Sequence, residues 1–135
     1  MTYQIEEIQG IGPAFAEKLT AAEITTTSDL LAKCCTSSGR DKVAEVTGLS
    51  TAQILKWANL ADLMRVSGIG PQFSELLEGA GVDTVKELRT RNAANLAAKM
   101  DEVNQEKHLS GSAPVQKTVQ AWIDSAKDMD PMITY

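Results

Sequence analysis

The sequence repeats itself, and this repeat constrains the fold more than any other feature of the chain. The stretch IQGIGPAFAEKL at residues 8–19 returns as VSGIGPQFSELL at residues 66–77. Self-similarity of this kind indicates a duplicated structural unit. The chain is therefore predicted to contain two units, residues 1–60 and residues 61–135. The correspondence continues through Ala22 and Ala80, Ile24 and Val82, Thr26 and Thr84, and Leu30 and Leu88.

Two further correspondences require a change of spacing between the copies. Glu45-Val46 pairs with Glu102-Val103 after a slip of one residue, and Trp57 pairs with Trp122 if the second copy is longer. We place the extra residues in the stretch NQEKHLSGSAP, residues 104–114. Since no Gly- or Ser-rich linker separates the copies, we expect the two units to pack into one compact body.

Each unit is predicted to be helical throughout, so the predicted fold class is all-α. A short amphipathic helix over residues 3–9 is expected to end at Gly10. Gly12 then acts as the N-cap of the next helix and Pro13 as its first residue, where the missing N–H costs nothing. No segment alternates apolar and polar residues in the manner of a strand.

Later helices are predicted from their capping signals. Thr26-x-x-Asp29 and Thr84-x-x-Glu87 resemble capping boxes, and each is expected to begin the third helix of its copy. A fourth helix is predicted over residues 40–46, before Gly48. Ser50 is expected to begin a fifth helix that runs toward the second unit.

The sequence apolar-x-Gly-apolar-Gly between two short helices resembles the helix-hairpin-helix motif. The resemblance covers residues 8–19 and again residues 66–77. In that family the first glycine permits the turn, the apolar residue enters the core, and the second glycine lets a phosphate approach. The resemblance implies that each loop presents unpaired backbone N–H groups and the positive end of a helix dipole, which together favour an anion.

A further resemblance concerns the first unit. Its stretches GIGPAFAEKLTAAEITTTSDLL and VAEVTGLSTAQILKW are similar to the amino-terminal helix-hairpin-helix domain of the archaeal and eukaryotic RecA-type recombinases. This comparison makes Thr47-Gly48-Leu49-Ser50 a second hairpin whose closing glycine has become Ser50. The two-unit layout is similar to an uncharacterised bacterial family, a domain of unknown function, and that likeness implies a fold rather than a function.

Two interpretations of the Gly-Ile-Gly loops stay open: tight turns that place isoleucines in the core, or contacts to phosphate. The residues that follow the second glycines, PAFAE and PQFSE, lack the lysine or arginine that is usual in hairpins that bind DNA. With 13 Lys and Arg against 18 Asp and Glu, the chain has a net charge of −5, so phosphate binding is expected to be weak. The candidate contacts are Gly10, Ile11, Gly12, Gly68, Ile69, Gly70, Arg65, Lys86, Arg89 and Arg91.

The other chemically distinctive residues have structural interpretations. Trp57 and Trp122 are predicted to pack in the core rather than to stack on bases. Cys34 and Cys35 are expected to be reduced, because a bridge between adjacent cysteines is strained. His108, the single histidine, is expected to be exposed. Without spaced Cys or His partners, neither a metal site nor a cofactor is predicted.

The sequence favours an interaction module that is not an enzyme. It has no nucleophile elbow, and its Gly-x-Gly loops follow helices rather than the strands of a dinucleotide site. The acidic composition favours protein–protein recognition or scaffolding, and the alternative is weak, sequence-independent binding to nucleic-acid backbones. Since no apolar run approaches ~20 residues and no signal peptide is evident, a cytoplasmic protein without membrane contact is expected.

Overall fold

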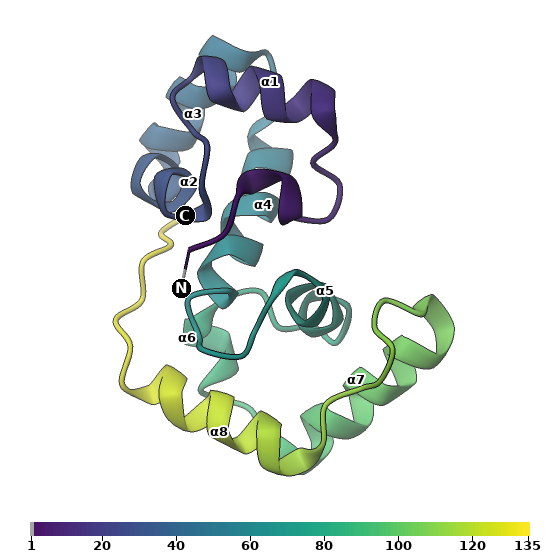
Figure 1. The fold of residues 1–135 in the computed structure, drawn as a ribbon. Helices are drawn as coiled ribbons and strands as arrows, with labels where there is room; N and C mark the ends of the chain where they lie inside the picture. Colours follow the sequence, from purple (N-terminus) through teal and green to yellow (C-terminus); the bar gives the residue numbers. More distant parts are fainter. Residues whose placement is uncertain (1) are drawn as a thin grey trace. The chain divides into compact units, whose positions relative to one another are not determined.

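Helices make up the secondary structure, as the sequence predicts. The computed structural model describes residues 2–135, and in that range it contains eight α-helices, one 3-10 helix and no strand (Figure 1). The predicted all-α class is thus confirmed. The elements are η1 Ile5–Glu7, α1 Pro13–Ala21, α2 Thr27–Cys34, α3 Ser37–Thr47, α4 Thr51–Leu63, α5 Pro71–Gly79, α6 Val85–Leu88, α7 Ala93–Lys107 and α8 Gln116–Lys127.

The chain divides into two compact units. The first holds the chain up to Asp62 together with Met132–Tyr135, and the second holds Leu63–Pro131. The division lies at the end of α4, two residues beyond the boundary that the repeat suggests. The sequence gives no sign that the last residues belong to the first unit.

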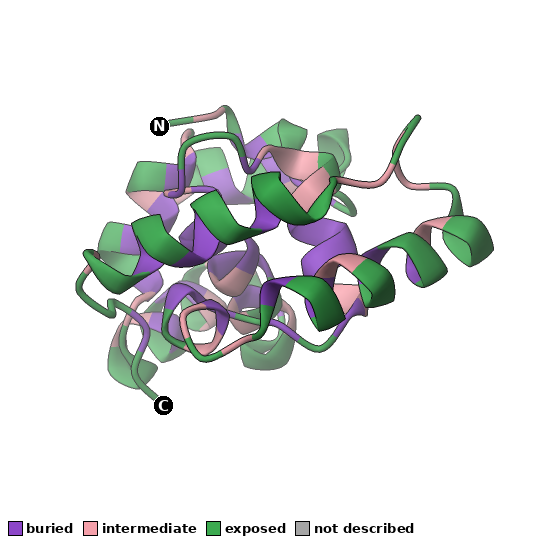
Figure 2. Cartoon of the chain, turned by 90° about the horizontal axis from the view of Figure 1, so that it is seen from below, coloured by how far each residue is buried: buried purple, intermediate pink, exposed green. Residues whose placement is uncertain are grey.

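Each unit has its own apolar core, and the helices turn one side inward and leave the other exposed (Figure 2). Aliphatic side chains dominate both cores, because only 4% of the residues are aromatic. Fully buried members in the first unit include Ile5, Ile8, Leu19, Ile24, Leu30 and Ile54. Those in the second include Ile69, Leu76, Leu77, Val82, Leu88 and Met100.

The predicted helix over residues 3–9 is wrong, since only Ile5–Glu7 form a single 3-10 turn. The backbone before this turn is extended and pairs with the segment that precedes α2. Thr27 N donates to Tyr3 O at 2.8 Å, and Ile5 N donates to Thr25 O at 3.1 Å. These hydrogen bonds hold Gln4 in an isolated bridge with Thr26, which a helix could not make.

The capping box of the first unit is confirmed. Thr26 Oγ1 accepts a hydrogen bond from Asp29 N at 3.1 Å, and the Asp29 carboxylate accepts from Thr25 N and Thr26 N. The bonds from Thr25 lower the pKa of Asp29 below its ordinary value of 3.8, and the bonds from Thr26 add to the effect. Because the folded pKa is lowered, this stabilisation is present above the ordinary pKa and is lost as the pH falls through the lowered one.

The structure revises the repeat register in α3 and α7. Gly48 at φ 76° and His108 at φ 52° end these helices in the left-handed conformation, and each N–H bonds the carbonyl four residues back. Counting back from these two residues makes buried Val43 the equivalent of buried Val103. The predicted pairing of Val46 with Val103 is wrong, because Val46 is 69% exposed. His108 is exposed, as expected.

The pairing of Trp57 with Trp122 is confirmed by their surroundings. Trp57 is 2% exposed, and its ring centroid lies 5.4 Å from that of Phe15. Trp122 is 3% exposed and lies 5.3 Å from Phe73 in the same tilted arrangement. Both indoles are core residues of their units, so neither is available to stack on a nucleic-acid base.

Candidate functional site

Two turns with the same backbone geometry precede α1 and α5. We call them turn 1, residues 10–12, and turn 2, residues 68–70. Gly10 has φ 93° and Gly68 has φ 94°, a region that side chains other than glycine rarely occupy. Ile11 and Ile69 follow, 4% and 0% exposed, as buried residues of the two cores. The expected roles of the first glycine and of the isoleucine are therefore confirmed.

The helices that follow these turns begin without a side-chain cap. Gly12 and Gly70 are the N-caps of α1 and α5, and as glycines they supply no side-chain cap hydrogen bond to the first turn of either helix. By contrast, Thr26, Thr36 and Asn92 cap α2, α3 and α7 through their side-chain oxygens. The first turns of α1 and α5 thus keep N–H groups that can donate to a solvent molecule or an anion.

The two glycines of turn 1 differ in what the fold requires of them. A Cβ at Gly10 would face Trp57 Nε1 at 3.8 Å, and its φ is left-handed. Gly12 has φ −86°, which any residue can adopt, and a Cβ there would meet nothing within 4 Å. The fold therefore needs a glycine at position 10 but not at position 12.

We expect Gly68→Ala and Gly10→Ala to destabilise their units, whereas Gly12→Ala changes stability little. Left-handed backbone costs an alanine about 1–2 kcal/mol, and Gly68→Ala costs more because its Cβ would lie 3.1 Å from Trp122 Nε1. Denaturant unfolding followed by tryptophan fluorescence measures the change. Equal losses for Gly10→Ala and Gly12→Ala would contradict the assignment.

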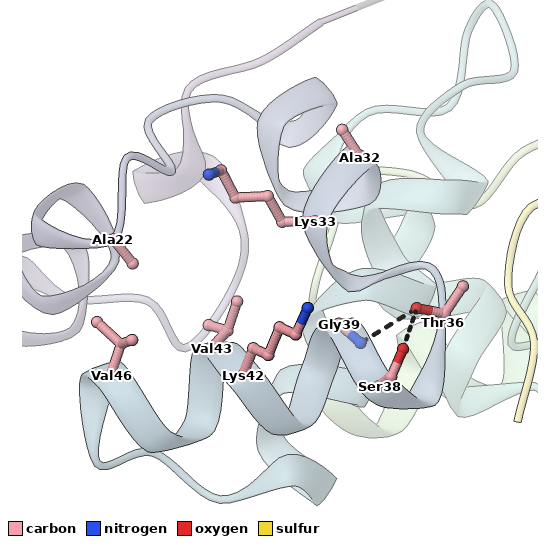
Figure 3. A pocket seen from close by; sticks show the side chains of 9 residues that line it. All are labelled: Ala22, Ala32, Lys33, Thr36, Ser38, Gly39, Lys42, Val43 and Val46. Atoms are coloured by element: carbon pink, nitrogen blue, oxygen red, sulfur yellow. Dashed lines mark hydrogen bonds between the residues drawn. The ribbon is translucent and has the colours of Figure 1, made fainter.

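A groove lies on the first unit between the end of α1, the end of α2 and the outer side of α3 (Figure 3). Its volume is about 420 Å³. Figure 3 shows Ala22 and Val46 at one end and the hydroxyls of Thr36 and Ser38 at the other. Lys33 from α2 and Lys42 from α3 reach into the space between. We call this hollow, with Ala22, Lys33, Gly39, Lys42, Val43 and Val46 among its lining residues, the first-unit groove.

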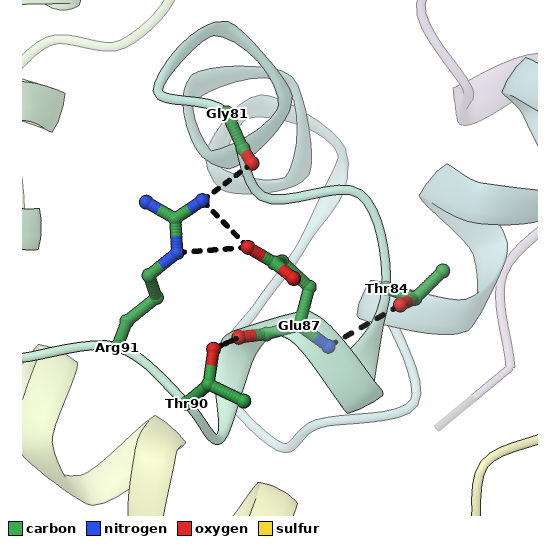
Figure 4. Close-up of polar contacts among 5 residues, drawn as sticks. All are labelled: Gly81, Thr84, Glu87, Thr90 and Arg91. Carbon is green, nitrogen blue, oxygen red and sulfur yellow. Dashed lines mark hydrogen bonds and ion pairs between the residues drawn. The ribbon is translucent and has the colours of Figure 1, made fainter.

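The second unit has a smaller hollow, of about 380 Å³, in the corresponding place. Ala80, Arg91 and Lys99 line it, at the repeat positions of Ala22, Lys33 and Gly39. Arg91, at the position of Lys33, is held by hydrogen bonds within its own unit. It donates to Glu87 Oε1 at 2.7 Å and to Gly81 O at 2.8 Å (Figure 4). Arg91 thus serves the fold of its own unit.

The pairing of Glu87 with Arg91 also changes the cap of α6, which spans Val85–Leu88. Thr84 Oγ1 accepts from Glu87 N at 3.4 Å, as predicted, but the Glu87 carboxylate bonds Arg91 instead of returning to the cap (Figure 4). Thr90 Oγ1 donates to Glu87 O at 2.7 Å (Figure 4). The capping box of the second unit is therefore only half formed.

Of the other basic residues predicted to contact phosphate, the two arginines make hydrogen bonds within the second unit and the lysine is exposed. Arg65 donates to Asp130 O at 3.0 Å, and Arg89 donates to Met129 O at 3.4 Å. Both arginines thus hold the segment that follows α8. Lys86 is exposed on α6. The structure brings Arg65 and Arg89 together at this segment, whereas Arg91 bonds elsewhere.

A buried arginine that the sequence analysis does not single out lies in α3. Arg40 is 5% exposed; its Nη1 donates to Cys34 O at 3.0 Å and its Nη2 to Thr134 O at 2.6 Å. Thr134 N in turn donates to Cys35 O at 2.8 Å. These bonds join the last residues of the chain to the first unit. An arginine within an otherwise polar helix gives no sequence signal of burial, because its partners are main-chain carbonyls.

The two cysteines are free thiols, as expected. Burial raises the pKa of the Cys34 thiol to about 11, although the nearby Arg40 charge opposes the shift. Cys34 is thus protonated at neutral pH and is not a nucleophile. Among residues 2–135 no group of three or more His, Cys, Asp or Glu side chains could hold a metal ion.

The sequence comparisons give a family but no characterised relative. No curated protein and no solved structure matches the chain. Over the range that the structure describes, no helix is both long enough and apolar enough to span a bilayer. A family model described as "Domain of unknown function (DUF4332)" matches residues 9–129, which include both turns and all eight α-helices. The chain therefore belongs to this uncharacterised domain family.

Proposed function

We propose that this protein is a non-enzymatic, cytoplasmic interaction module that recognises a protein partner. The observation that carries the proposal is the use of three arginines: Arg65, Arg89 and Arg91 each donate to a main-chain carbonyl of their own unit. Binding to a phosphate backbone depends on cations that neutralise phosphates. With these arginines engaged in the fold of a chain of net charge −5, protein recognition is the better-supported function.

The geometry of the turns supports an interpretation as two tandem helix-hairpin-helix units. Each turn has a glycine at positive φ, a buried isoleucine, and a Gly-Pro start to the next helix. The Gly48-Leu49-Ser50 segment adds a similar turn between α3 and α4, with Gly48 left-handed and Leu49 buried. This arrangement supports the likeness of the first unit to the amino-terminal domain of the RecA-type recombinases.

The proposal is tested by recovery of partners from a native extract with the full chain as bait, with and without nuclease treatment. We expect a defined protein to be retained in both samples, because contacts between proteins do not need nucleic acid. Loss of every retained protein after nuclease treatment, or recovery of none, would overturn the protein-recognition function.

A second candidate function is contact with a phosphate backbone at turn 1 and turn 2. Two observations favour it. Both helices begin without a side-chain cap, and the fold does not require position 12 to be a glycine. Since only backbone N–H groups and a dipole would hold the phosphate, binding is expected to be weak and to disappear as salt rises.

Substitution of Gly12 and Gly70 by aspartate tests this second function. Aspartate is a favourable N-cap, and Gly12 and Gly70 have φ values of −86° and −96° that any residue can adopt, so we expect the fold to be retained. The added carboxylates would occupy the N–H groups and repel phosphate. We expect at least about a tenfold loss of affinity for labelled duplex DNA at low salt, where charge contacts are least screened. Gly111→Asp with Ser112→Asp is the matched control, because it adds the same two charges at adjacent exposed residues, and a Cβ at Gly111 would meet nothing within 4 Å. No binding by the unmodified chain at low salt would exclude this function.

A further inference from the structure

We propose that the first-unit groove binds a short segment of a protein partner that carries two carboxylates and a branched aliphatic side chain. This inference rests on the proposed protein-recognition function, and it names the surface and the chemistry of the partner. Its evidence comes from the residues that line the groove and from the different residues at the same places in the second unit.

The fold does not require the groove residues on α3. Counting back from the left-handed residues Gly48 and His108 places Lys42 opposite Glu102, and Val46 opposite Glu106. Both glutamates are exposed on α7. The same helical position thus accepts a glutamate in one unit and presents a lysine or an exposed valine in the other. A valine that is 69% exposed contributes little to the core of its own unit.

The charge of the groove is opposite to that of the chain. Its ionisable lining residues are Lys33 and Lys42, on a protein of net charge −5. The pair formed by Lys33 Nζ and Glu23 Oε2 is 3.8 Å long, and the two side chains are 41% and 88% exposed. Such an exposed pair contributes little stability, so Lys33 can exchange Glu23 for a carboxylate of a partner.

Arg91, at the corresponding position of the second unit, does not have this freedom, because Glu87 Oε1 lies 2.7 Å from its guanidinium. Lys99 is then the one exposed cation among the residues that line the second hollow, and its Nζ lies 3.7 Å from Glu102 Oε1, whereas the first-unit groove presents both Lys33 and Lys42. Electrostatic complementarity therefore selects an acidic segment and favours the first unit, which offers two exposed cations.

The apolar end of the groove is the reason for the branched aliphatic side chain in the proposed segment. Val43 and Val46 of α3 face Ala22, the residue that follows α1, across one end of the groove (Figure 3). The small Ala22 leaves room beside the two valines, and a branched aliphatic side chain placed there would remove Val46 from water. The carboxylates of the segment would then lie at Lys33 and Lys42, between this end and the hydroxyls of Thr36 and Ser38 (Figure 3).

The test selects peptides from a random phage-displayed library on the full chain and measures the best ones by calorimetry. The variant Lys42→Glu with Val46→Glu gives the first unit the residues that the second unit already has at these positions, so the fold is retained. The matched control is Lys117→Glu with Val115→Glu in the second unit. It makes the same charge change and replaces a valine that is 66% exposed, close to the exposure of Val46.

We expect the selected peptides to combine Asp or Glu with Leu, Ile or Val. Their affinity should fall at least about tenfold in the groove variant and stay unchanged in the control. Amide resonances of Lys33, Gly39 and Val43 should shift on binding. Peptides that bind the groove variant as well as the unmodified chain, peptides rich in basic residues, or no selected peptide would each overturn the groove proposal. None of these outcomes decides the proposed function, which fails only if the partner recovery described above also fails.

Discussion

Replacement of Trp57 by alanine is expected to destabilise the first unit by about 3–5 kcal/mol, the range for a buried tryptophan whose removal leaves a cavity. Trp57 is 2% exposed and lies against both the Phe15 ring and Gly10, so its loss affects α1 and turn 1 together. Because typical domains are stable by only about 5–15 kcal/mol, much of the stability of a unit this small depends on this residue. Native-state amide exchange, read separately for each unit, measures the loss.

Two further variants separate the loss of packing from other effects. Trp57→Phe keeps an aromatic ring beside Phe15 and should lose clearly less stability than Trp57→Ala. Trp122→Ala makes the equivalent change in the second unit, where the indole lies against Phe73 and Gly68. It should produce a comparable loss there and little change in the exchange of Ile8 and Leu19. A Trp57→Ala chain with exchange rates like those of the unmodified protein would show that the indole is not part of the core.

The sequence was sufficient to predict the features that rest on local backbone chemistry. Gly10 and Gly68, the Gly-Pro starts of α1 and α5, and the Thr26 cap each follow from the conformations that those residue types prefer. The tryptophan pairing could also be found, because a large aromatic residue rarely occupies the same place in both copies of a repeat without a packing reason. These features determine the repeat, and the repeat largely determines the class of fold.

Other features could not be predicted, because they depend on contacts between residues that are distant in the sequence. Residues 3–9 have an amphipathic pattern, but tertiary pairing with Thr25 and Thr27 holds their start extended. The predicted pairing of Val46 with Val103 is wrong because it rests on the shared dipeptide Glu-Val, whereas the structural equivalent of Val103 is the buried Val43. Because α7 has 15 residues and α3 has 11, the two helices cannot be aligned from their starts. Their correct register follows from their ends, where Gly48 and His108 are both left-handed.

The candidate site was predictable in part. The sequence identified both turns and the basic residues near the second turn, but not that Arg65 and Arg89 bond the segment after α8. Lysines look alike in a sequence whether they line a groove or cover an open surface. The first-unit groove becomes visible only when α1, α2 and α3 are placed together, and its difference from the second unit only when the register is corrected.

Replacement of Arg40 by methionine is expected to destabilise the first unit by about 3 kcal/mol, because hydrogen bonds from a charged group contribute about 1.5–3 kcal/mol each. The variant leaves Cys34 O and Thr134 O without their donors, and it removes the cation that lies 6.0 Å from the Tyr135 ring centroid. Denaturant unfolding followed by Trp57 fluorescence, in a Trp122→Phe background, measures the change for the first unit alone. Lys42→Met, an exposed change of the same kind on the same helix, should alter stability by no more than about 0.5 kcal/mol.

A double-mutant cycle shows whether Arg40 acts through the last residues of the chain. Deletion of residues 132–135 removes Thr134 and the buried Ile133, and so removes one of the two carbonyls that Arg40 bonds. If the guanidinium and this segment stabilise the unit together, the deletion and Arg40→Met must cost less in combination than the sum of their separate costs. Arg40→Lys should keep part of the coupling, since one ammonium can bond a carbonyl but cannot span both. Strictly additive losses would mean that Arg40 stabilises α3 independently of the segment, and that the segment is held mainly by Ile133 and the bond from Thr134 N to Cys35 O.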